Sequence, residues 1–174
     1  VKDAHSIFVQ TSNNSYKAYL VAFEPASDVA ILKIEDKEFR FGKSPLPYSL
    51  STRTSGLGQK VFTIGFPQDD LVYNEGYISC ESGYGGDAAS YQLEMTANPG
   101  QSGAPVIDKY GNVVALVTGK QSNTSGTTIA VHADALLQLI RTLPKDTNLH
   151  LTTTNRLRGL ERTEQVSRLR DYLC

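Results

Sequence analysis

Short β-type runs separated by turn residues fill the first 132 residues, and this pattern most constrains how the chain can fold. Valine, isoleucine and tyrosine are frequent in the runs, whereas glycine, asparagine, aspartate, proline and serine lie between them. Many short strands at regular spacing are typical of an all-β barrel or sandwich. The pattern predicts strands over residues 7–10, 18–23, 29–34, 60–64, 75–80, 91–95, 104–107, 113–118 and 128–131.

The period of the apolar residues changes after this region. Following Asp134, which suits a helix cap or a first-turn acid, apolar residues recur at helical spacing: Leu136, Leu137, Ile140 and Leu143. Pro144 ends the predicted helix. Residues 145–155 are polar and rich in threonine, and helical spacing returns over 161–174.

Five arginines lie in the last 19 residues, at positions 156, 158, 162, 168 and 170. One interpretation is that residues 156–174 dock onto another domain or chain. The other is a helix whose apolar stripe, with Val166, Leu169 and Leu173, packs on the rest of the chain and leaves the arginines in solvent. The second interpretation is favoured, and the first stays open.

The segment Asn-Pro-Gly-Gln-Ser-Gly-Ala-Pro at 98–105 carries the strongest chemical signal. Gly100 and Gly103 bracket Ser102, so the backbone can turn tightly and direct N–H groups at an oxyanion. Asp28 heads the apolar run 29–34 earlier in the chain. An acid at the start of a buried strand and a serine in a glycine turn suggest two members of a Ser-His-Asp triad.

Six segments in the same order resemble those of the trypsin-like serine proteases, and within them of the HtrA (DegP-like) group: 27–34, 58–67, 75–79, 98–105, 111–117 and 129–132. The resemblance covers most of residues 1–143. It implies an all-β, chymotrypsin-like double β-barrel whose N-terminal barrel is incomplete in this chain, with a C-terminal helix and a helical tail. Ala104 stands where the family usually has glycine.

The same resemblance divides the chain into three parts. Residues 1–51 would form the remainder of the N-terminal barrel and the interbarrel linker. Residues 52–143 would form the C-terminal barrel with its closing helix. Residues 144–174 would form a polar linker and an amphipathic helix.

The resemblance also implies roles for particular residues. Ser102 would be the nucleophile and Asp28 the acid that orients the catalytic histidine, while the N–H groups of Gly100 and Ser102 would form the oxyanion hole. The substrate pocket would be lined by Thr96, Ala97, Val117, Thr118 and Gly119. These residues are small or apolar and carry no charge, so cleavage after small or aliphatic residues is expected.

The catalytic histidine of the family is not at its expected place. The chain has three histidines, His5, His132 and His150, and none matches the family position. Residues 1–4 resemble those that follow the catalytic histidine, so the base is expected upstream of Val1. His5 is the alternative, but it is several residues too close to Asp28 in sequence.

The leading interpretation is a serine endopeptidase that works through an acyl-enzyme, and the alternative is a catalytically inactive trypsin-like domain that binds or regulates a partner. A polypeptide substrate is the expected partner. The net charge of −1 argues against nucleic acid or an anionic membrane. No apolar run is long enough for a transmembrane helix, and the histidines and cysteines lack the spacing of a zinc site. No metal or cofactor is expected, and the sequence leaves the compartment open between an extracytoplasmic bacterial space and the cytoplasm.

Overall fold

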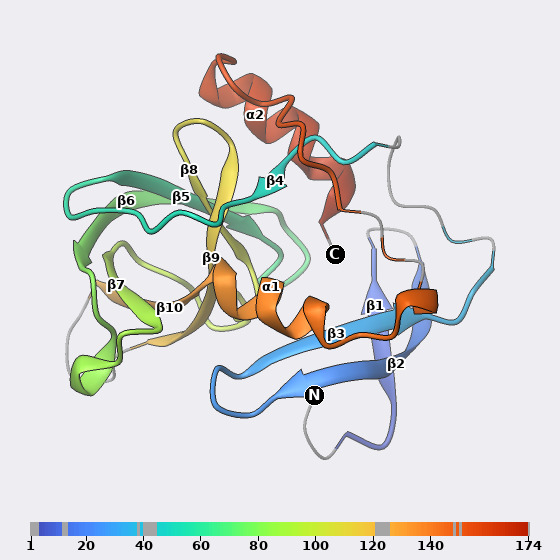
Figure 1. The fold of residues 1–174 in the computed structure, drawn as a ribbon. Helices are drawn as coiled ribbons and strands as arrows, with labels where there is room; N and C mark the ends of the chain where they lie inside the picture. The colour runs from blue at the N-terminus through green and yellow to red at the C-terminus, as the bar shows by residue number, and fades with distance from the viewer. Residues whose placement is uncertain are drawn as a thin grey trace.

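The computed structural model describes residues 4–11, 14–37, 39, 45–120, 126–147, 149 and 151–173. Near the N-terminus, three antiparallel strands form a small sheet in the order β1-β2-β3. Their bounds are Ile7–Gln10 for β1, Ser15–Glu24 for β2 and Val29–Ile34 for β3. Figure 1 shows this sheet on one side of the molecule, below helix α1 (Ala133–Arg141).

The second sheet contains a closed barrel. Its strands are β5 (Lys60–Gly65), β6 (Val72–Cys80), β7 (Ser90–Glu94), β8 (Pro105–Asp108), β9 (Asn112–Lys120) and β10 (Thr127–His132). They follow the order β10-β7-β6-β5-β8-β9, and β10 also pairs with β9, which closes a six-stranded antiparallel barrel. β4 (Ser49–Leu50) adds to β9 in parallel.

Each of the nine predicted strands has a counterpart in the structure, so the mostly β fold with a closed barrel is confirmed. The short strand β4 was not predicted, because two residues show no alternation that a sequence pattern could reveal. The interior of the barrel holds a cluster of buried residues: Val61, Ile78, Tyr91, Leu93, Val106, Ala115 and Ala130. The division of the chain at residues 51 and 143 stays a prediction.

Helix α1 begins directly after β10 and joins the two sheets. Leu139 of the helix packs with Val29 of β3 and Val131 of β10 in one buried cluster. The helix predicted from the spacing after Asp134 is confirmed. His132 occupies the cap position and Asp134 lies in the first turn, where its negative charge favours the helix N-terminus.

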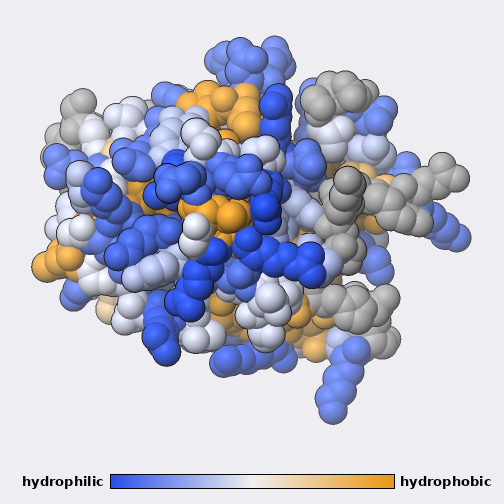
Figure 2. Space-filling model, turned by 90° about the horizontal axis from the view of Figure 1, so that it is seen from above, coloured by the Kyte–Doolittle hydropathy of each residue, from blue (hydrophilic) through white to orange (hydrophobic). Residues whose placement is uncertain are grey.

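The tail packs on the outside of the barrel, as the second interpretation of its sequence predicts. It contains α2 (Arg162–Leu169) and the short 3-10 helix η3 (Arg170–Tyr172). Leu157 and Leu169 are buried against Phe62 and Ile107 of the barrel. Figure 2 looks onto the side that carries α2 in Figure 1, and shows mainly hydrophilic residues with small hydrophobic areas between them. Docking of another domain or chain on this outward side stays a prediction.

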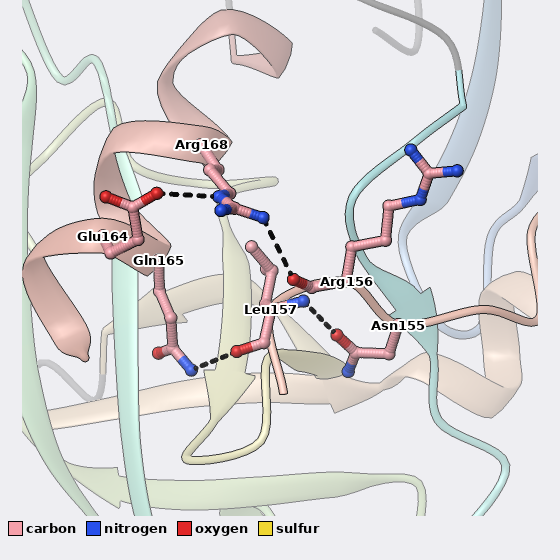
Figure 3. Close-up of polar contacts among 6 residues, drawn as sticks. All are labelled: Asn155, Arg156, Leu157, Glu164, Gln165 and Arg168. Atoms are coloured by element: carbon pink, nitrogen blue, oxygen red, sulfur yellow. Dashed lines mark hydrogen bonds and ion pairs between the residues drawn. The ribbon is translucent and has the colours of Figure 1, made fainter. Parts of the chain in front are cut away.

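Polar contacts fix the start of the tail (Figure 3). The side-chain nitrogen of Gln165 donates to the backbone oxygens of Leu157 at 3.0 Å and Lys109 at 3.3 Å. The side-chain oxygen of Asn155 accepts from the Leu157 N–H at 2.8 Å, and its nitrogen donates to the backbone oxygen of Tyr110 at 2.9 Å. The tail is therefore attached to the turn between β8 and β9 by hydrogen bonds as well as by apolar contacts.

Leu157 lies over a glycine in this turn. Gly111 has a φ of 83°, and a Cβ added to it would lie 2.3 Å from the Cβ of Leu157. The turn itself is held by Asp108, whose Oδ1 accepts from the N–H groups of Tyr110 at 2.8 Å and Asn112 at 2.9 Å. The absence of a side chain at Gly111 thus allows Leu157 to reach the barrel.

We predict that Leu157→Ala lowers the free energy of unfolding by about 2–5 kcal/mol, because it leaves a cavity at a position with 0% exposure. Chemical denaturation measures the effect. Leu151→Ala is the control, since Leu151 is 43% exposed and its truncation removes little buried surface. Equal losses in the two variants would show that the tail does not pack on the barrel as described.

Candidate active site

The loop between β7 and β8 crosses one end of the barrel. In the closed ring, β7 and β8 are separated by β6 and β5 on one side and by β10 and β9 on the other. The connection over residues 95–104 therefore has to span the barrel mouth. Within it, Ala97 and Gln101 are buried, whereas Gly100 and Ser102 are exposed. The serine that the sequence singles out thus faces solvent above a filled barrel.

Backbone hydrogen bonds hold Ser102 in a tight turn. The N–H of Gln101 donates to Asn98 at 3.1 Å, and the N–H of Ala104 donates to Gln101 at 2.9 Å. The N–H of Gly103 donates to Val117 of β9 at 2.7 Å. Among the described residues, neither the Gly100 N–H nor the Ser102 N–H donates a hydrogen bond. Both N–H groups are therefore available to an acceptor.

Close contacts with the loop after β5 explain two small residues here. A Cβ added to Gly100, whose φ is 96°, would lie 2.4 Å from the carbonyl oxygen of Pro67. A Cβ added to Gly65 would lie 3.3 Å from the Cβ of Ala104. The methyl group of Ala104, which departs from the family pattern, is accommodated because Gly65 opposite has no side chain.

Asp28 lies in the turn before β3, and its side chain is exposed. Its φ of 52° is in the left-handed region, which aspartate tolerates better than most residues. The next residue, Val29, is buried against Val131 and Leu139. Within the described part of the chain, no hydrogen bond links Asp28 to Ser102. This is expected of two triad members, because a histidine joins them.

The residues predicted to line the substrate pocket come from two segments of the barrel. Thr96 and Ala97 follow β7, and Val117, Thr118 and Gly119 lie on β9. Ala97 and Val117 are buried, Thr96 is exposed, and Thr118 is half-buried, with its hydroxyl donating to the Ile129 oxygen of β10 at 3.3 Å.

A threonine on β10 ties these segments together. The hydroxyl of Thr128 donates to the Met95 oxygen at 2.8 Å and accepts from the Ala97 N–H at 3.2 Å. Thr128 is completely buried, so the bonds are shielded from water. The arrangement brings the end of β7 next to β10, which in turn pairs with β9, the strand of Val117, Thr118 and Gly119.

A cavity of about 380 Å³ lies beside Ser102. One side is formed by the loop over residues 95–104, including Gly100 and Ser102, and another by Leu136 of α1 together with Leu169 and Leu173 of the tail. The sequence did not predict that the tail lines this cavity, because no local sequence pattern indicates which part of the barrel a distant helix covers.

Neither of the two described histidines lines that cavity. His5 is exposed near the N-terminus, and His150 lies outside the described residues. His132 is half-buried with its ring centroid 3.9 Å from that of Tyr91, and it lines a separate cavity with Ser27. Burial lowers the pKa of His132 below its ordinary value, an effect that the negative charge of Asp87 partly opposes.

The described residues contain no group of three His, Cys, Asp or Glu side chains that could hold a metal ion. In the same part of the chain, no helix has the length and apolar character needed to cross a membrane.

Residues 1–116 match the family model of the trypsin-like peptidase domain. A probable periplasmic serine endoprotease, DegP-like, of Ectopseudomonas mendocina is 31% identical over 158 residues, which are 84% of this chain and 31% of that protein. Protease Do-like 5, chloroplastic, of Arabidopsis thaliana is 31% identical over 145 residues, which are 75% of this chain and 42% of that protein. The chain thus spans less than half the length of these relatives.

Solved structures share the fold. The serine endoprotease from Yersinia pestis has a TM-score of 0.67 at 24% identity, covering 84% of this chain and 51% of that one. The HtrA-type protease AlgW, solved with a decapeptide, has a TM-score of 0.63 at 24% identity, covering 80% of this chain and 44% of that one. An inactive form of the protease Rv3671c has a TM-score of 0.64 at 22% identity, covering 82% and 75%. These similarities confirm the predicted chymotrypsin-like fold.

We predict that Gly100→Ala destabilises the protein by about 1–3 kcal/mol more than Gly103→Ala. Both glycines have a positive φ, so a side chain strains both positions, but only at Gly100 would the new Cβ meet the Pro67 carbonyl. At Gly103 nothing lies within 4 Å of the added atom. Denaturant titration of the two variants gives the difference. Equal losses would mean that Pro67 does not lie against the loop.

Proposed function

This chain belongs to the trypsin-like peptidase family, and on that premise we propose that it is part of a serine endopeptidase that hydrolyses peptide bonds through an acyl-enzyme. The observation that carries the proposal is the exposed Ser102 in a loop across the barrel mouth, next to two N–H groups without a partner among the described residues. Kinship with DegP-like endoproteases supports a polypeptide as the substrate.

In the proposed reaction, the Ser102 oxygen attacks the substrate carbonyl while a histidine takes its proton. The negative oxygen of the tetrahedral intermediate accepts hydrogen bonds from the Gly100 and Ser102 N–H groups, and loss of one such donor typically costs about 10²–10³ in rate. The histidine then protonates the leaving amine. Water, activated by the same histidine, hydrolyses the ester and restores the serine.

The base in this mechanism would be a histidine that precedes Val1. Neither described histidine lines the cavity that contains Ser102, and residues 1–4 match those that follow the family histidine. Asp28 would hold that histidine in the correct tautomer and stabilise its cation. A serine hydroxyl is a poor nucleophile without a base, so turnover depends on this group.

The second candidate is a catalytically inactive domain that binds a partner through the cavity beside Ser102. It is favoured by the absence of a histidine beside Ser102 among the described residues. The residue directly before Val1 in the full-length protein separates the two functions, since a histidine there supports the enzyme.

For the enzyme, we propose cleavage after small or aliphatic residues. None of the five proposed pocket residues is charged, and two of them, Ala97 and Val117, are apolar and belong to the buried core of the barrel. A charged side chain buried there without a partner would cost several kcal/mol. Glu94, the acid nearest in sequence, is exposed.

We predict that a fluorophosphonate probe labels the full-length protein at Ser102, and that Ser102→Ala abolishes labelling and peptide hydrolysis, because the attacking oxygen is gone. Mass spectrometry of the labelled peptide locates the site. Ser79→Ala is the matched control, since Ser79 is exposed on β6 away from the loop. Persistent labelling of Ser102→Ala would refute this assignment of the nucleophile.

In the same assay, Asp28→Asn should leave the protein folded and lower turnover by about four orders of magnitude, because the histidine loses its orienting partner. Asp70→Asn, in the loop before β6, is the control and should retain activity. Near-normal turnover of a folded Asp28→Asn protein would show that Asp28 is not the triad acid.

Profiling of cleavage sites in a peptide library should show cuts mainly after Val, Ala, Leu or Thr. Preference among these residues should be loose, because one methylene in an apolar pocket changes selectivity by only about 10- to 200-fold. A majority of cuts after Arg or Lys would contradict the apolar pocket and point to an acid turned into the site.

A further inference from the structure

Gln101 is buried although it directly precedes the exposed Ser102. Its exposure is 1%, and its amide lies in the barrel mouth. The side-chain oxygen accepts two hydrogen bonds, from the backbone N–H of Asn98 at 2.7 Å and from the side-chain nitrogen of Asn74 at 3.1 Å. One oxygen atom therefore joins the loop over residues 95–104 to strand β6 of the barrel.

The bond to Asn98 closes a reciprocal pair across the turn. The Gln101 N–H donates to the Asn98 oxygen at 3.1 Å, while the Asn98 N–H donates to the Gln101 side chain. Pro99 and Gly100 lie between them, and proline followed by a glycine with positive φ is the sequence of a type II turn. Because Gly100 lies inside this closed ring, the direction of its N–H depends on the Gln101 side chain.

The second bond attaches the turn to a small polar group inside the barrel. Asn74 pairs across strands with Thr63, so the two side chains lie on the same face of the sheet. Within the described part of the chain, Thr63 Oγ1 and Gln101 Nε2 are buried without a hydrogen-bond partner. The unpaired amide nitrogen of Gln101 is costly, whereas its oxygen satisfies the Asn98 N–H and the Asn74 side-chain nitrogen. The side chain therefore fixes the geometry of the turn at a cost to its own amide nitrogen.

We propose that Gln101 is a positioning residue for the oxyanion hole: its side-chain oxygen, anchored by Asn74, holds the Asn98–Ser102 turn so that the Gly100 and Ser102 N–H groups converge on one acceptor. This rests on the proposed function and deepens it. Gln101 does not touch the substrate. It acts on the charge that develops in the transition state, so its loss lowers kcat and leaves KM nearly unchanged.

The test uses two nearly isosteric apolar variants, Gln101→Met and Asn74→Leu, and their combination. Gln101→Met removes the acceptor of both bonds, and we expect kcat of the active-site-titrated full-length protein to fall by about 10²–10³. Asn74→Leu removes only the anchor, and we expect a loss of about tenfold. Because both act through one oxygen, the double variant should be no slower than Gln101→Met alone.

Amide hydrogen exchange gives a readout that does not depend on activity. In wild-type protein the Asn98 N–H is held by the Gln101 oxygen, and in Gln101→Met it should exchange at least about fivefold faster. Gln92→Met is the control, because Gln92 is a half-buried glutamine on β7 that bonds to Ser82 and Gly83 instead. It should leave both kcat and the exchange of Asn98 unchanged.

An unchanged kcat in folded Gln101→Met, or losses that add up in the double variant, would overturn the proposal. If Gln101→Met fails to fold, the Asn74→Leu variant tests the proposal. An unchanged kcat in Asn74→Leu would show that Asn74 does not anchor the turn. A wild-type protein that no fluorophosphonate labels at Ser102 would refute the proposed function and the catalytic role of Gln101 with it. Faster amide hydrogen exchange at Asn98 in Gln101→Met than in wild type would still show that the Gln101 oxygen holds the turn.

Discussion

Closure of the barrel by the β9–β10 pair is the constraint on which the arrangement of the site depends. Because β10 also pairs with β7, the six strands form a ring in which β7 and β8 take opposite places. Their connection then has to pass from one side of the barrel to the other, and its buried residues Ala97 and Gln101 place it across the barrel mouth. The position of Ser102 therefore follows from topology, while the glycines around it only allow the local turns.

A loop that crosses a mouth has one side in the protein interior and the other in water. Side chains on the interior side are shielded from water, so their polar atoms need hydrogen-bond partners. Ala97 is apolar and needs none, whereas Gln101 is buried with a polar amide. Its oxygen has two donors, but its nitrogen has no partner in the described part of the chain. The amide oxygen of Gln101 thus stabilises the loop, whereas the unpaired amide nitrogen costs free energy. Such local costs tend to persist where function requires a fixed geometry.

Much of this was predictable from sequence because the signals are local. Runs of β-forming residues between turn residues predicted nine of the ten described strands, and apolar residues at helical spacing predicted the helix after Asp134. Family motifs pointed to Ser102 and Asp28 as site residues, whose roles stay proposals. Contacts between distant segments leave no local pattern in the sequence. Leu157 packs over Gly111, and Leu169 lines the cavity beside Ser102. Both contacts join segments that are far apart in the sequence. Gln101 was missed, although an uncharged polar residue between Gly100 and Ser102, in a loop that joins two strands, was a usable signal.

The relative placement of Asp28 and Ser102 depends on a small apolar contact between the two sheets. Val29 packs with Val131 and Leu139, and α1 continues directly from β10, so the turn that carries Asp28 is tied to the barrel that carries Ser102. The carboxylate itself is exposed. In water it would attract a histidine cation only weakly, because the high dielectric screens the charge. A histidine ring that packed over Asp28 would remove the carboxylate from water as it formed the hydrogen bond, so the same contact would both orient the base and strengthen the field that stabilises its cation.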